Sequence, residues 1–423
     1  MARKWMVPVL LLVLVGIGAF LAMDRAAFRS RLGSTAAQRR EPVPPAPATP
    51  DAPRHYPQGR RPLAIADHRY PASFFPNTEL IGPAEMRLTA LGTGMASAAP
   101  AQKSAGWMLE LGNGDIFLFD VGTGSQQNLV ALRPDWSKLD KVFVSHLHID
   151  HVGDLDALLL EGWLAGRYTP LHVYGPTGET PELGTKAFAQ NLRAAYAWDI
   201  QSRAGRLPEA GGRLIAHAAD FRTTQVVYEK SGVKITQFPQ IHVLAGAVGF
   251  RLDWNELSFV FGGASIPSRW FLEQARGADI AIHECFDTPE RLAERTGASV
   301  REAVEEMLDA HTPPAGFGKL MAAVRPRLAV AYHAALGPEE MRRQVEAIRE
   351  SYDGPLTLAE DLTVWNVSAD HIEVRRAVVD TLPLPAGTTR GYAEAARAER
   401  QALSEALRRG AWEGYAPPAL PQD

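Results

Sequence analysis

Short apolar stretches separated by turn residues dominate the chain from Met86 onward. Stretches of four to eight residues favour β-strands, whereas longer stretches with a 3.6-residue period favour helices. We expect strands at 86–91, 106–111, 115–121, 141–145, 171–174, 233–238, 246–253, 257–262, 278–283 and 327–332. We expect helices at 154–165, 185–197, 299–309, 315–323 and 391–409. Two runs of strands, each followed by helices, predict two sheets packed face to face with helices outside.

The N-terminal region has a different composition. Arg3 and Lys4 precede an apolar run from Trp5 to Met23, which is long enough to cross a bilayer and also resembles a signal peptide. We interpret residues 1–24 as a membrane anchor or signal segment. The protein is then expected to be exported, either periplasmic or tethered to the inner membrane by residues 5–23.

The remaining chain divides by composition. Residues 25–61 are rich in Pro and Ala and predict an extended tether. Residues 62–376 carry all the predicted strands, so we expect one catalytic domain there. Residues 377–423 are expected to form a peripheral helix and tail.

The densest group of polar residues is the sequence Ser-His-Leu-His-Ile-Asp-His at 145–151. Three imidazoles and a carboxylate so close together would repel or remain unsatisfied unless a divalent metal organised them. The group follows a predicted strand and precedes a predicted helix, where α/β proteins usually place chemistry. This part of the chain therefore predicts a metal site.

The pattern His-x-His-x-Asp-His resembles the signature of the metallo-β-lactamase superfamily, and the resemblance extends over residues 86–335. The sequences Leu-Gly-Thr-Gly at 91–94 and Phe-Asp-Val-Gly-Thr-Gly at 119–124 look like the branch of tRNA 3′-processing endonucleases and arylsulfatase-like hydrolases. The Ala-Ile-His-Glu segment at 281–284 is similar to that branch, and residues 262–271 resemble hydrolases of guanitoxin biosynthesis. The resemblance implies an α/β fold, a four-layer αββα sandwich.

The same resemblance implies two adjacent metal positions. The first would be held by His146, His148 and His242, and the second by Asp150, His151 and His333. Asp150 would also orient the attacking water, and His311 would donate a proton to the leaving group or stabilise developing negative charge. Three imidazoles leave a tetrahedral zinc one position open for water, which is then deprotonated near neutrality. We expect Zn²⁺ as the cofactor, and the same ligands also suit Mn²⁺ or Fe²⁺.

One position departs from the family. Its members carry an aspartate that bridges both metals after the Gly-Gly of this strand, and here Ala264 follows Gly262 and Gly263. A methyl group cannot bind a cation. We therefore expect one tightly bound zinc and a second that is weak or absent.

These residues predict a metal-dependent hydrolase that uses metal-bound hydroxide on an ester-type bond: a phosphodiester, phosphoester, sulfate ester or lactone. Ala264 leaves one alternative open, a non-catalytic binding protein of the same fold with at most one metal.

The net charge of −4 shows no basic surplus, which argues against nucleic acid as a partner and favours a small-molecule ester. The apolar segment predicts a membrane contact, and the family resemblance suggests a homodimer. The single cysteine, Cys285, excludes an internal disulfide framework.

Overall fold

The computed structural model describes residues 70–96, 101–334, 337–380 and 404–410. The predicted N-terminal segment, the tether and most of the C-terminal tail lie outside these residues. Among the helices described, none combines the length and the apolar character needed to cross a membrane.

The first sheet has the strand order β1-β16-β15-β2-β3-β4-β5-β6-β7. Neighbouring strands are antiparallel from β15 through β2 and β3 to β4, and they are parallel from β4 through β5 and β6 to β7. The strands are β1 (Ser73–Phe74), β2 (Met86–Gly92), β3 (Gly106–Leu111), β4 (Ile116–Val121), β5 (Lys141–Phe143), β6 (Leu171–Pro176), β7 (Leu214–Ala219), β15 (Thr363–Val367) and β16 (Ile372–Ala377).

The second sheet has the order β14-β13-β12-β11-β10-β9-β8. Its pairs are antiparallel from β8 to β11 and parallel from β11 to β14. The strands are β8 (Gln225–Lys230), β9 (Val233–Pro239), β10 (Val248–Trp254), β11 (Leu257–Phe261), β12 (Ile280–Glu284), β13 (Leu328–Tyr332) and β14 (Leu356–Leu358).

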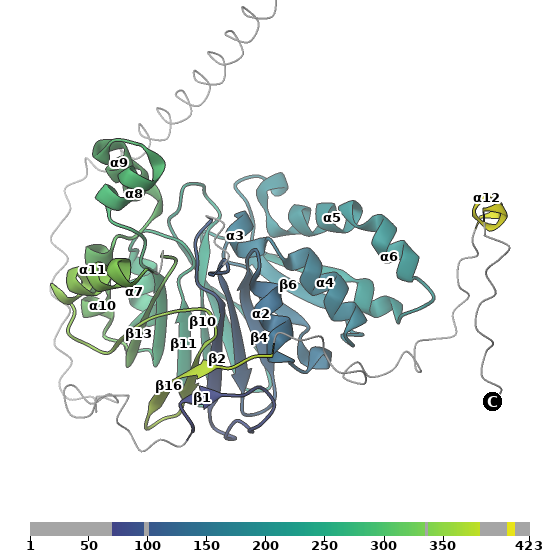
Figure 1. Cartoon of the computed structure of the whole chain (residues 1–423), viewed down its shortest axis with the longest axis horizontal. Coiled ribbons are helices and arrows are strands. Elements are labelled where there is room, and N and C mark those ends of the chain that lie inside the picture. Colours follow the sequence, from purple (N-terminus) through teal and green to yellow (C-terminus); the bar gives the residue numbers. More distant parts are fainter. Residues whose placement is uncertain (1–69, 97–100, 335–336, 381–403, 411–423) are drawn as a thin grey trace, which may run out of the picture. The chain divides into compact units, whose positions relative to one another are not determined.

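Helices lie on the outer face of each sheet (Figure 1). Those beside the first sheet are α2 (Ser125–Leu132), α3 (Ile149–Val152), α4 (Leu155–Leu164), α5 (Thr185–Ala195) and α6 (Ala197–Arg203). Those beside the second are α7 (Arg269–Ala275), α10 (Pro314–Val324) and α11 (Pro338–Arg349). The helices α8 (Pro289–Thr296) and α9 (Val300–Ala310) pack against each other. The helix α12 spans Glu405–Arg409.

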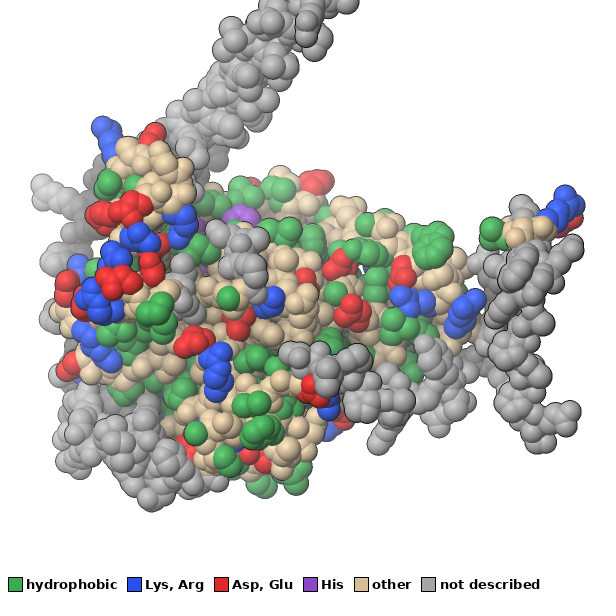
Figure 2. Space-filling model, viewed as in Figure 1, with side chains coloured by type: hydrophobic (Ala, Val, Ile, Leu, Met, Phe, Trp, Pro, Cys, Tyr) green, Lys and Arg blue, Asp and Glu red, His purple; other side chains and the backbone are tan. Residues whose placement is uncertain are grey.

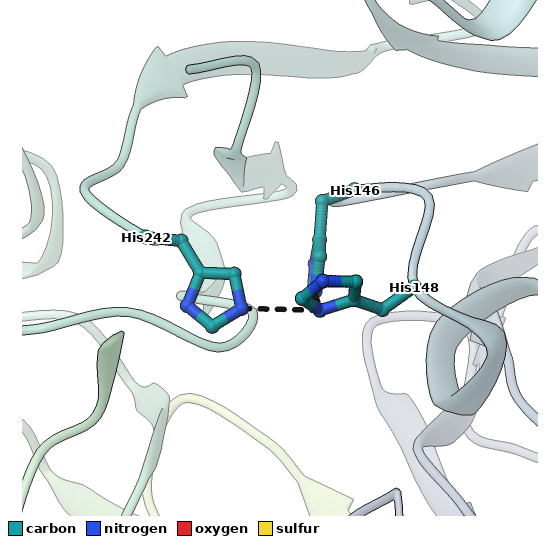
Figure 3. A group of neighbouring side chains, drawn as sticks. All are labelled: His146, His148 and His242. Carbon is teal, nitrogen blue, oxygen red and sulfur yellow. Dashed lines mark hydrogen bonds between the residues drawn. The ribbon is translucent and has the colours of Figure 1, made fainter. Parts of the chain in front are cut away.

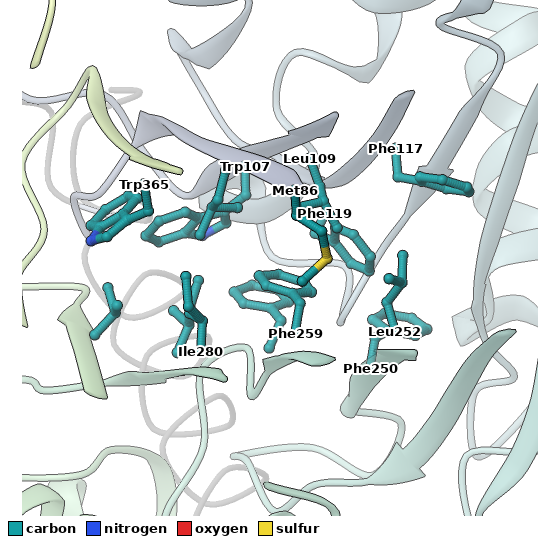
Figure 4. Packing of buried hydrophobic residues seen from close by; sticks show 14 of the residues in the cluster. Met86, Trp107, Leu109, Phe117, Phe119, Phe250, Leu252, Phe259, Ile280 and Trp365 are labelled. Carbon is teal, nitrogen blue, oxygen red and sulfur yellow. The ribbon is translucent and has the colours of Figure 1, made fainter. Parts of the chain in front are cut away.

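Large apolar side chains fill the space between the two sheets. Trp107 and Phe119 of the first sheet face Phe259 and Phe261 of the second, and all four are at most 1% exposed (Figure 4). The rings of Phe119 and Phe259 lie 4.8 Å apart. Each sheet also packs against its own helices through one further cluster of buried apolar residues. The predicted αββα sandwich is therefore confirmed, with burial of apolar area as its main stabilising contribution.

The strands expected from the sequence are present with small shifts at their ends. No strand was expected between 174 and 233, but β7 and β8 lie there as edge strands with few buried residues. The strands β15 and β16 were also missed. They follow α11 in sequence but pair with β1 and β2, a contact between distant segments that periodicity cannot show.

The two sheets meet at the edge that carries the histidines. The backbone nitrogen of Val248, in the second sheet, donates to the carbonyl of Ser145, which follows the first sheet's β5, at 2.9 Å. On the other side, the nitrogen of His333 donates to the carbonyl of Thr93 at 2.8 Å. These bonds hold the loops after β5, β9 and β13 at a single site.

A substitution at Gly122 can test how tightly this edge of the two sheets is packed. A Cβ added there would lie 1.9 Å from the carbonyl oxygen of Asp150, so Gly122→Ala must displace the loop that carries the histidines. We expect a loss of about 1–3 kcal/mol in the free energy of unfolding, measured by urea denaturation. Gly316→Ala, in α10, is the control, because its nearest neighbour would be 3.4 Å away. An unfolding midpoint equal to that of the control would contradict this account.

Candidate metal centre

Three imidazoles from two loops converge on one point (Figure 3). Nδ1 of His148 lies 3.0 Å from Nε2 of His146 and 3.2 Å from Nε2 of His242. One ring nitrogen carries at most one proton, so it cannot form a hydrogen bond with both neighbours at once. A cation between the three nitrogens would accept all three lone pairs. The geometry therefore fits a metal ion.

The protonation of these rings also suits a metal. Burial lowers the pKa of His242 to about 4 and lowers the pKa of His146 well below its usual value. Both rings are therefore neutral at pH 7, and a metal can bind without displacing a proton from them. Nδ1 of His242 is bonded to the carbonyl oxygen of Ala310 at 2.9 Å, which directs its Nε2 toward the cluster.

A second group of donors comprises Asp150, His151 and His333. Oδ2 of Asp150 lies 3.0 Å from Nε2 of His333 and 3.4 Å from Nε2 of His151. All three side chains are buried, and their ligand atoms lie within 4.8 Å of one another. The structure thus brings together all six residues that the sequence suggested as ligands.

Asp120 fixes the orientation of His151. Its Oδ2 lies 2.6 Å from Nδ1 of His151, and its carboxylate also accepts hydrogen bonds from the backbone and hydroxyl of Ser145. Burial opposes a charge on His151, but Asp120 and Asp150 together raise its pKa to about 10. Without a metal, this ring is a buried cation between two carboxylates.

Glu284, which lies in the Ala-Ile-His-Glu segment noted in the sequence, connects His311 to His333 of the second group. Its Oε2 lies 2.9 Å from Nδ1 of His311 and 3.2 Å from Nδ1 of His333, and its Oε1 accepts from the backbone nitrogen of Ser265 at 2.6 Å. Glu284 ends β12 and is paired with Tyr332 of β13, which places it beside His333. The pairing of these two strands supplies the contacts with His311 and His333 that the sequence alone does not show.

His311 is held from two directions. Glu284 binds its Nδ1, and Phe286 stacks on its ring at a centroid distance of 3.9 Å and an angle of 4°. Its side chain is 16% exposed. The Nδ1 contact and the stacking together fix the position of this ring.

Ala264 is flanked by two residues that contact the site. Gly263, which has a φ of +61°, packs against the Cβ of Ser145, and Ser265 donates to Glu284. Position 264 is thus adjacent both to the histidine loop and to the second group of donors, and Ala264 itself is buried. Its methyl group supplies no ligand atom between them.

Two other histidines stay apart from this centre. His172 of β6 and His217 of β7 bind each other, with Nδ1 and Nε2 2.8 Å apart. Neither belongs to a group of donors in the described residues that could hold a metal.

The protonation states predict unequal proton release on zinc binding. At pH 7 the first group binds zinc with little proton release, whereas the second must displace the proton of His151. Below pH 10 the second site's affinity should therefore fall about tenfold for each unit of acidification. Calorimetric titration with zinc in buffers of different ionisation enthalpy measures the released protons. Equal release at both sites would contradict this prediction, and Asp120→Asn, which removes one of the two carboxylates, should reduce the release.

Comparisons with known proteins identify the family to which the chain belongs. Residues 86–286 match the family model described as anti-Pycsar protein Apyc1. Ribonuclease Z from Mycobacterium avium (strain 104) is 32% identical over 213 residues, covering 47% of this chain and 69% of that protein. Ribonuclease Z from Mycobacterium marinum is 29% identical over 214 residues, covering 47% and 70%. The structure of human tRNase Z, short form, aligns at 20% identity and a TM-score of 0.49, covering 66% of this chain and 98% of that one.

These relatives correct one expectation. The prediction that nucleic acid is not a partner is wrong, because the matching curated proteins are ribonucleases. The net charge of −4 is a sum over all 423 residues. It does not describe the electrostatic potential at a metal centre, where bound cations would attract phosphate. The relatives are enzymes, and the donor groups suit hydrolysis. The chain therefore belongs to the metallo-β-lactamase superfamily of hydrolases, in the group that includes ribonuclease Z.

Proposed function

We propose that this protein hydrolyses phosphodiester bonds in nucleic acid at the histidine centre. The observation that carries the proposal is the convergence of His146, His148 and His242 on one point that solvent can reach, because His148 is exposed. Among the ester-type substrates expected from the sequence, the names of the relatives support phosphodiesters over sulfate esters and lactones.

Zinc bound by the three histidines would supply a water of lowered pKa and would polarise the phosphoryl oxygens. Asp150, held by His333, has a carboxylate that can accept a hydrogen bond from the attacking water and so orient it. Asp120 keeps His151 in position beneath it.

His311 serves the other half of the reaction. As the bond between phosphorus and the leaving oxygen breaks, that oxygen takes a proton from Nε2 of His311. Glu284, bonded to Nδ1, stabilises the protonated ring before the transfer and restores its orientation afterwards. The buried carboxylate and the stacked Phe286 together fix the orientation of the His311 ring.

The metal content is the second part of the proposal. The first group has three neutral imidazoles and is sufficient for one zinc. The second lacks a carboxylate at position 264 and begins with a protonated His151. Both features weaken a second metal, so the proposed enzyme works with one tightly bound zinc and a second that is weak or absent.

Turnover of bis(p-nitrophenyl) phosphate and of a short RNA tests the activity. The zinc-loaded protein should hydrolyse both, a chelator should abolish the hydrolysis, and added zinc should restore it. His148→Ala should remove activity by removing a ligand. His311→Gln should reduce kcat by about 10²–10⁴-fold while zinc content stays unchanged. His217→Gln, outside the centre, is the control. Full activity of His148→Ala would exclude the proposed site.

Elemental analysis of wild type and Ala264→Asp tests the metal count. We expect about one zinc per chain in the wild type and about two in the variant, because the new carboxylate could join the two donor groups. Ala264→Asn is the matched control, since its neutral amide should add little. Two tightly held zinc ions in the wild type would refute the proposal for the second site.

A further inference from the structure

A third group of donors lies beside the two described above. It consists of Glu284, His311 and His333, whose ligand atoms lie within 4.8 Å of one another. Oε2 of Glu284 lies 2.9 Å from Nδ1 of His311 and 3.2 Å from Nδ1 of His333. Donor atoms bound to a tetrahedral zinc ion are about 3.4 Å apart, so small shifts would admit a cation here. Two imidazoles and one carboxylate are also a ligand set that suits zinc.

Nδ1 of His333 is the atom that points most directly to a ligand in this group. It is buried and lies at ion-pair distance from Glu284, but it is not aligned for a hydrogen bond with that carboxylate. No other group among the described residues is its hydrogen-bond partner. A buried ring nitrogen without a partner is uncommon, and a cation held between it and Glu284 would use its lone pair.

Solvent reaches this group through His311. The side chain of His311 is 16% exposed, whereas those of Glu284 and His333 are buried. Figure 2 shows histidine side chains at the surface close to α3, so part of the histidine centre is exposed on this face. An ion in solution can therefore meet Nδ1 of a partly exposed ring without the opening of the core.

The third group shares His333 with the second. Nε2 of His333 lies 3.0 Å from Oδ2 of Asp150, and Nδ1 faces Glu284 on the other side of the ring. A neutral imidazole has one lone pair for a metal and one proton for a hydrogen bond. A cation on Nδ1 leaves the proton on Nε2, where it is donated to Asp150. The second and third groups therefore cannot both hold a cation through the neutral ring of His333.

We propose that Glu284, His311 and His333 form an alternative position for a second zinc ion, and that zinc bound there inhibits the enzyme. The cation position stands on its own geometry, whereas the inhibition rests on the proposed function. Zinc on Nδ1 of His311 takes the lone pair of that atom and displaces any proton from it. The ring can then no longer carry protons on both nitrogens, so it ceases to be the imidazolium that gives a proton from Nε2.

Calorimetric titration of the full-length chain, loaded with one zinc ion and then given excess zinc, tests the position. His151→Gln removes a ligand that only the second group uses, and it should still bind additional zinc. The double variant His151→Gln, His311→Gln should bind that zinc at least about tenfold more weakly, because the third group loses a ligand. His151→Gln combined with His217→Gln is the matched control, since His217 lies outside the centre and should leave the binding unchanged.

The inhibition is measured in a background that keeps His151. Excess zinc should slow the hydrolysis of bis(p-nitrophenyl) phosphate by wild type, at concentrations that fill the additional position. The residual hydrolysis by His311→Gln should not respond to excess zinc.

The outcomes separate the two proposals. Equal binding of additional zinc by His151→Gln and its double variant with His311→Gln overturns the third position and leaves the proposed function standing. An equal response of wild type and His311→Gln to excess zinc overturns the inhibition. Binding that depends on His311, in a wild type that hydrolyses no diester at any zinc concentration, overturns the proposed function and leaves the cation position standing.

Discussion

The convergence of imidazole nitrogens on Nδ1 of His148 is the constraint on which the rest of the centre depends. Two neighbouring nitrogens at 3.0 and 3.2 Å cannot both share one proton with it, so the arrangement is satisfied by a cation. Burial keeps His146 and His242 neutral and therefore able to bind one. The loops that carry these rings are fixed by backbone bonds between the two sheets, so the sandwich determines the ligand geometry.

The carboxylates of Asp120 and Glu284 orient histidine rings. Asp120 and Glu284 each bind the ring nitrogen that points away from the centre, on His151 and on His311 and His333. Each carboxylate thereby decides which nitrogen faces the substrate or the metal. The two carboxylates lie in different sheets, at the end of β4 and at the end of β12. The centre therefore needs both halves of the sandwich in register.

The sequence predicted the two-sheet architecture and the heptapeptide at 145–151 because both depend on neighbouring residues. His242, His311 and His333 could be assigned only by resemblance, since nothing local distinguishes them from other histidines. Glu284 lies in the Ala-Ile-His-Glu segment that the resemblance singled out, but its contacts with His311 and His333 depend on the pairing of β12 with β13. The strands β15 and β16 were missed for the same reason, since their partners lie far away in the sequence. The charge argument failed because a whole-chain sum carries no information about one site.

The small side chain of Ala264 has a consequence for how such enzymes can diverge. The buried hydrophobic clusters that hold the sheets and helices together are formed by other residues, and Ala264 belongs to none of them. In the scheme proposed above, exchange between alanine and aspartate at this position acts on the metal centre rather than on those clusters. A single substitution would then move a member of this group between one-metal and two-metal chemistry, so that metal demand could change over evolution while the fold is inherited.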